Sequence, residues 1–115
     1  AGVLFCLDYE GDMERMGSRN LPFTAGTSVA YGLSKEEALM SITLNAAKIL
    51  KVDNTLGSLE QGKDATLIVS EGDALDVMSN KISLAFIRGK KLDLNNHQTD
   101  LFKKYKKRHK EFSNE

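Results

Sequence analysis

The sequence predicts an α+β fold, and three observations lead to that prediction. A continuous apolar run at residues 2–7 is typical of a strand buried on both faces. Apolar residues then recur at helical spacing between positions 21 and 50. Two stretches rich in β-branched and aromatic residues follow at 64–70 and 81–89. We therefore expect one strand, a group of helices, and then a small set of further strands.

The helical part of the chain carries clear start and stop signals. Pro22 near a helix start and Gly32 after the last apolar position predict a helix over residues 21–31. A capping box then follows in the segment SKEE, where Ser34 caps the amide of Glu37 and the Glu37 side chain reaches back.

The helix that starts after Ser34 is expected to break near Leu44. Thr43 and Asn45 have side chains that favour helix caps over helix interiors. We therefore predict two helices in this region, the second with Asn45 as its N-cap.

The remaining elements are predicted to be strands and a terminal helix. The two β-rich stretches are bounded by Gly, Asp and Asn, and a short hairpin is expected across Arg88, Gly89 and Lys90. Residues 96–112 are expected to form a helix with lysines around most of its surface. Its apolar residues gather roughly on one side: Leu101, Phe102, Tyr105 and Phe112.

Composition excludes several classes of protein and favours none strongly. The 16 basic and 16 acidic residues give a net charge of zero, so bulk charge does not indicate a polyanionic partner. Charge is nevertheless uneven, with four acids between positions 8 and 14 and six lysines and arginines after position 102.

No segment is long and apolar enough to span a membrane, and no signal peptide is evident. Cys6 cannot form an internal disulfide, and we expect it to be buried as a small apolar residue.

Two ordered motifs resemble the C-terminal end of metal-dependent amidohydrolases, in the imidazolonepropionase-like and prolidase-like branch. The first has the form T-x-N-x-A-x-x-L, and the second has the form G-S-L-x-x-G-K-x-A-D-L, followed by D-x-L and G-K. This chain departs from the second motif at Thr66, which stands at the D position. The matching residues are Thr43, Asn45, Ala47 and Leu50, then Gly57, Ser58, Leu59, Gly62, Lys63, Ala65 and Leu67, then Asp73, Leu75, Gly89 and Lys90. Each motif alone is weak evidence for the family, but the ordered set of motifs is specific for it.

The resemblance implies that the chain is an α+β fragment of a larger fold. It would hold the last strand (3–7) and C-terminal helices of a (β/α)₈ TIM barrel, the C-terminal strands of a small β-sandwich, and a terminal helix. The expected segments are 1–52 from the barrel, 53–94 from the sandwich and 95–115 as the basic helix. The implied partners are the missing N-terminal barrel of the same protein, a second copy in a homo-oligomer, and a small-molecule substrate. We expect no membrane partner and no nucleic acid.

The resemblance also places a catalytic acid at the end of the first strand. In this family an aspartate there binds a divalent metal, for which zinc is the expected ion, and takes a proton from the metal-bound water. The best register places Glu10 at that aspartate, with Asp8 two residues earlier; a shifted register offers Asp8 or Asp12 instead. Glu10 is therefore the predicted metal ligand, and Glu10 and Asp8 are the predicted catalytic acids. A degenerate metal-free site and a solvated acidic loop remain as alternatives.

Substrate binding is predicted at Arg19 and Asn20, because an arginine there can bind a substrate carboxylate in bidentate fashion. A structural ion pair or cap is the competing interpretation. His97 and His109 lack a second ligand at helical spacing and are expected on the surface. The other family ligands are absent from this sequence, so the chain alone should bind no metal and should not catalyse.

The function predicted for the full-length protein is hydrolysis of a C–N bond in a cyclic amide or a dipeptide-like substrate. A catalytically silent member of the family is the first alternative. A small α+β interaction domain with a basic anion-binding helix is the second. Whether the parent is an active enzyme, which substrate it takes and which compartment it occupies stay open.

Overall fold

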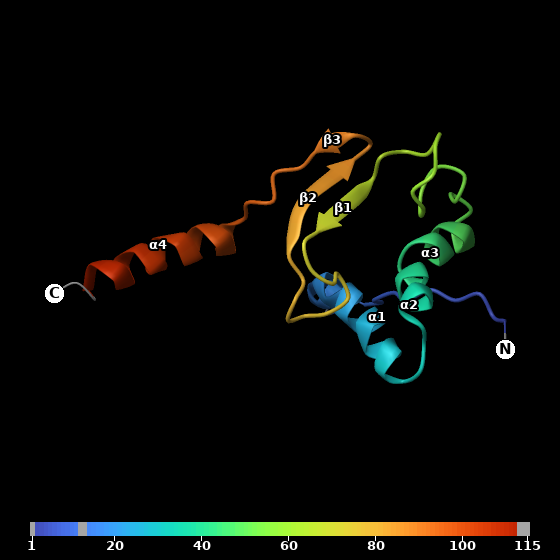
Figure 1. The fold of residues 1–115 in the computed structure, drawn as a ribbon, viewed down its shortest axis with the longest axis horizontal. Coiled ribbons are helices and arrows are strands. Elements are labelled where there is room, and N and C mark those ends of the chain that lie inside the picture. The colour runs from blue at the N-terminus through green and yellow to red at the C-terminus, as the bar shows by residue number, and fades with distance from the viewer. Residues whose placement is uncertain (1, 12–13, 113–115) are drawn as a thin grey trace.

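The structure is a computed structural model, and it describes residues 2–11 and 14–112 (Figure 1). Three short helices form one group below a small sheet, and a longer helix stands apart at the C-terminal end (Figure 1). The elements in chain order are the 3₁₀ helix η1 (Glu14–Asn20), α1 (Leu21–Ala30), α2 (Lys35–Ser41), α3 (Leu44–Ile49), β1 (Leu67–Ser70), β2 (Ile82–Ile87), β3 (Lys90–Lys91) and α4 (His97–Phe112). The predicted α+β content is confirmed.

The predicted helices form because local signals decide where each one begins and ends. Helix α1 has Pro22 in its first turn, where a missing N–H costs nothing. The capping box at α2 is complete, since Ser34 Oγ accepts from the amide of Glu37 at 3.2 Å and the Ser34 amide donates to Glu37 Oε2 at 3.0 Å. The predicted break between the second and third helices falls at positions 42–43.

The prediction that Asn45 caps the third helix is wrong. The N-cap is Thr43, whose carbonyl accepts from the amide of Ala47 at 3.0 Å and so makes the first turn of α3. The Thr43 side chain makes no cap hydrogen bond, and its hydroxyl donates back to the carbonyl of Leu39 at 2.7 Å. Asn45 lies inside the first turn and is buried.

The strand expected over residues 3–7 is absent from the described structure. Residues 2–10 have no regular secondary structure, and Val3 and Leu4 are 74% and 51% exposed. One backbone hydrogen bond, from the amide of Leu7 to the carbonyl of Ser41 at 3.1 Å, ties this segment to α2. A barrel strand needs a neighbour on each edge to pair its N–H and C=O groups. The described part of the chain supplies none, so the apolar run stays unpaired.

The later strands form an antiparallel sheet in the order β1-β2-β3. Leu67 pairs with Phe86, and the register shifts by one residue between Val69 and Ser70. The predicted hairpin between β2 and β3 is confirmed. Its two turn residues, Arg88 and Gly89, both have positive φ, at 49° and 75°, which matches the turn type that suits the twist of paired strands.

The core lies where the loop between β1 and β2 meets α1 and α2. Ala25 and Ala38 are fully buried, and Leu75 from the loop packs between them. Gly26 allows this approach, because a Cβ at that position would lie 2.1 Å from the carbonyl oxygen of Leu75. The 72–79 loop is therefore held against α1 by close backbone contact, and small residues in both helices make room for it.

Candidate functional site

The predicted catalytic acids lie in the N-terminal segment just before η1. Asp8 and Glu10 are both exposed. Asp8 Oδ1 accepts a hydrogen bond from the amide of Tyr9 at 2.8 Å. Both carboxylates are therefore accessible from solvent.

Tyr9 anchors this acidic segment to the helices, and sequence reasoning did not assign it that role. Its hydroxyl lies 2.7 Å from Thr24 Oγ1 in α1. Thr24 Oγ1 in turn lies 3.3 Å from the carbonyl of Asn20. The Tyr9 ring also packs over Gly17 in η1, where a Cβ would come within 3.3 Å of the ring. A tyrosine between two acids in the sequence is the one signal that could have indicated such an anchor.

The predicted substrate-binding pair lies close to this anchor. Arg19 and Asn20 form the end of η1 and the residue before α1, and both are exposed. The structure connects Asn20 to the acidic segment through the Thr24–Tyr9 contacts. No hydrogen bond or ion pair between described residues joins Arg19 to Asp8 or Glu10. Asp12, the third candidate acid, lies outside the described residues.

The acids present do not by themselves make a metal site. Carboxylate oxygens suit a divalent cation, but a catalytic zinc site takes three protein ligands. Within residues 2–11 and 14–112, no group of three or more His, Cys, Asp or Glu side chains is arranged to hold a metal ion. The described residues can therefore contribute at most part of a donor set.

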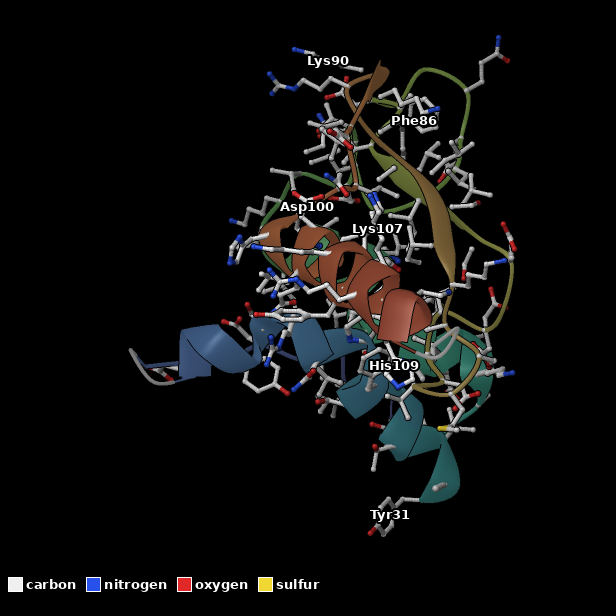
Figure 2. The ribbon with its side chains drawn as sticks, turned by 90° about the vertical axis from the view of Figure 1, so that its left-hand side faces the viewer. Tyr31, Phe86, Lys90, Asp100, Lys107 and His109 are labelled. Atoms are coloured by element: carbon white, nitrogen blue, oxygen red, sulfur yellow. The ribbon has the colours of Figure 1, made fainter. Side chains whose placement is uncertain are left out.

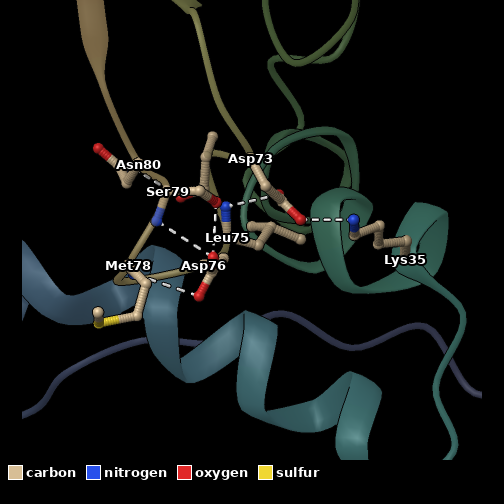
Figure 3. A network of polar contacts seen from close by, with 8 residues as sticks. Lys35, Asp73, Leu75, Asp76, Met78, Ser79 and Asn80 are labelled. Atoms are coloured by element: carbon tan, nitrogen blue, oxygen red, sulfur yellow. Dashed lines mark hydrogen bonds and ion pairs between the residues drawn. The ribbon is translucent and has the colours of Figure 1, made fainter.

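A second polar cluster lies in the 72–80 loop and is structural (Figure 3). Asp73 accepts from the amide of Leu75 at 3.0 Å through Oδ1 and pairs with Lys35 at 2.5 Å through Oδ2. Asp76 accepts from the amides of Met78 and Ser79 at 3.2 and 3.1 Å. All four carboxylate oxygens are engaged. This cluster closes the loop and ties it to α2 rather than offering a free acid.

These contacts make the fold sensitive to acid. The hydrogen bond from Lys35 lowers the pKa of Asp73 below its ordinary value of 3.8, and the hydrogen bond from Ser79 lowers that of Asp76. A carboxyl group whose pKa is lower in the folded state stabilises the fold at pH values above its unfolded-state pKa. This contribution is lost as the pH falls through the folded-state pKa. We expect the midpoint of thermal unfolding to fall as the pH drops below about 4. By circular dichroism, Asp73→Asn should lose part of that pH dependence, whereas Asp93→Asn, in the exposed linker before α4, should keep it.

The lysine of the segment EQGK, Lys63, belongs to a turn. Lys63 Nζ donates to Ser58 Oγ at 2.5 Å and pairs with Glu60 at 3.1 Å. Hydrogen bonds from Ser58 and Lys63 lower the pKa of Glu60. The motif therefore closes its own loop and presents no phosphate cradle.

Comparison with known proteins places these features in a family. Residues 3–104 match the Amidohydrolase family, which is most of the chain. The chain belongs to the amidohydrolase family. This confirms the resemblance carried by the two motifs, and the match runs from the N-terminal segment through the sheet and into α4.

Relatives of this amidohydrolase chain include curated enzymes with two different names. It is 35% identical over 79 residues to an imidazolonepropionase of Picrophilus torridus, covering 64% of this chain and 20% of that protein. It is 30% identical over 90 residues to an adenine deaminase of Desulforamulus reducens, covering 76% of this chain and 14% of that protein. The chain thus spans a fifth or less of the length of these relatives.

A solved structure supports the same relationship. An amidohydrolase from Thermotoga maritima MSB8 superposes with a TM-score of 0.59 at 36% sequence identity, covering 64% of this chain and 19% of that one. The amidohydrolase fold is therefore shared over most of the chain. The assignment of individual segments to a barrel and a sandwich, and the boundaries at residues 52 and 94, stay predictions.

Proposed function

We propose that this amidohydrolase chain is the C-terminal part of a hydrolase that cleaves a C–N bond in a cyclic amide or dipeptide-like substrate. The observation that carries the proposal is the family match together with the accessible acids of the N-terminal segment. Adenine deaminase is among the names of its relatives, and imidazolonepropionase is another. Both names fit a reaction at a C–N bond.

Glu10 is the residue that we propose to hold a divalent metal in the full-length protein, with Asp8 as the alternative. A bound metal would lower the pKa of its water to near neutrality. The carboxylate of Glu10 would then accept that proton, and Tyr9 would keep the acid in place through its contact with Thr24. Arg19 would bind a carboxylate of the substrate. The remaining metal ligands must come from the rest of the protein.

The partner that we propose for this chain is the remaining barrel of the same protein. An apolar cavity of about 700 Å³ opens between α2, α3 and β1. Its walls include large apolar residues with substantial exposure: Leu39, Leu50, Leu59 and Ile68. Exposed apolar area of this extent marks an interaction surface, and its position beside the predicted barrel helices supports the barrel as the partner. Val3 and Leu4 in the N-terminal segment support the same conclusion. A second copy of the protein remains the further proposed partner.

The test is hydrolysis by the full-length protein that contains this chain. Purified protein should release product from a cyclic amide such as an imidazolone. A chelator should abolish that activity, and added divalent metal should restore it. Absence of hydrolysis together with absence of bound metal would contradict the proposal and favour the catalytically silent alternative.

A further inference from the structure

Helix α4 is the part of the molecule that no other element covers. It makes no contact with another helix or strand in the described part of the chain, and it points away from the helices and sheet (Figure 1). Phe102 and Tyr105 are 64% and 58% exposed, and Leu101 is also exposed. Leu101 and Phe102 both lie on the same side of the helix as Tyr105, because positions three and four apart fall close together around its axis.

Cations border this apolar stripe on both edges. Lys106 Nζ lies 5.5 Å from the centre of the Phe102 ring, and the Arg108 guanidinium lies 6.0 Å from the centre of the Tyr105 ring. Figure 2 shows Lys107 and Asp100 on the side of α4 opposite His109, which follows Tyr105 by one turn. The helix is thus amphipathic, with an aromatic stripe, flanking cations and a basic back.

Net charge decides which kind of surface fits such a helix. Residues 97–112 contain six lysines and arginines and two acids, a formal charge of +4 with histidines neutral. A second copy of α4 would bring these flanking cations together, so self-pairing is disfavoured. Duplex nucleic acid would satisfy the cations through its phosphates but would leave the aromatic stripe without a partner. An anionic lipid surface satisfies both sets of residues.

We propose that α4 binds the surface of an anionic lipid bilayer. The helix lies in the plane of the interface, with Leu101, Phe102 and Tyr105 between the acyl chains and with the lysines extended to the lipid head groups. In the described residues no helix is long and apolar enough to cross a membrane. The sequence-based expectation of no membrane partner rested on the lack of a spanning segment, and surface binding needs none.

The experiment measures sedimentation of the full chain with lipid vesicles. Vesicles with about 30% phosphatidylserine in phosphatidylcholine should bind the protein at least about tenfold more tightly than phosphatidylcholine alone. Raising the salt to about 0.5 M should remove most of this difference. Equal binding to both kinds of vesicle, or binding to neither, would overturn the proposal.

Matched variants distinguish the contribution of the aromatic stripe to vesicle binding from that of the positive charges. Phe102→Ala with Tyr105→Ala should weaken binding about tenfold, whereas Tyr31→Ala, an 88% exposed tyrosine after α1, should not. Lys103→Gln with Lys107→Gln should also weaken binding, whereas Lys90→Gln with Lys91→Gln on β3 should not. Because α4 contacts no other element of the described chain, the two α4 variants should keep the thermal stability of the parent. Retention on duplex DNA that is as strong as on vesicles and unaffected by the aromatic change would overturn the lipid assignment.

Discussion

Gly26→Ala should destabilise the protein by about 2 kcal/mol. The added methyl group would lie 2.1 Å from the carbonyl oxygen of Leu75, which is backbone and cannot rotate away. Overpacking of this kind costs about 3 kcal/mol at the upper end of its usual range. Replacing a helical glycine by alanine stabilises the helix by about 1 kcal/mol. The net loss should lower the midpoint of thermal unfolding by roughly 10 °C.

The matched control is Gly17→Ala in η1. There the closest atom to an added methyl group belongs to the Tyr9 ring, at 3.3 Å, and a side chain can move where backbone cannot. We expect that variant to stay within about 1 kcal/mol of the parent. If Gly26→Ala unfolded at the same temperature as the parent, the close packing of the 72–79 loop on α1 would be wrong.

Glu10→Gln should lower kcat/KM of the full-length protein by at least about a hundredfold. The amide keeps the shape of the side chain but cannot accept the proton of a metal-bound water. General-base catalysis typically increases the rate by about a hundredfold or more. Asp8→Asn tests the alternative register in the same assay. Glu71→Gln is the control, since Glu71 is an exposed acid beside β1 that pairs with Lys81. A full effect in Asp8→Asn with none in Glu10→Gln would move the catalytic role to Asp8.

Local chemistry accounts for the elements that the sequence predicted well. The capping box of Ser34 and Glu37, the helix break before Leu44 and the turn at Arg88 and Gly89 each depend on neighbours within four residues. Such contacts form wherever the segment is placed. The side chain of Asp73 also makes a local contact, because its Oδ1 accepts from the amide of Leu75, two residues later.

The features that the sequence did not reveal depend on distant partners. The 3–7 segment has a strand-like sequence, but pairing needs other strands that the described residues lack. The cap of α3 is a different, local case, because Thr43 and not Asn45 provides the first helical carbonyl. The Tyr9–Thr24 contact and the Lys35–Asp73 ion pair join separate elements, and no spacing rule predicts them. The metal-ligand role of Glu10 stays a prediction, because the further ligands that it requires are not among the described residues.

Metal content of the full-length protein is the most direct test of the account. Elemental analysis should find bound divalent metal in the parent and in Glu71→Gln, and a loss of at least about tenfold in metal affinity in Glu10→Gln. Zinc is the expected ion. Unchanged metal content in Glu10→Gln would contradict the account and would leave Asp8 or Asp12 as the candidate ligand.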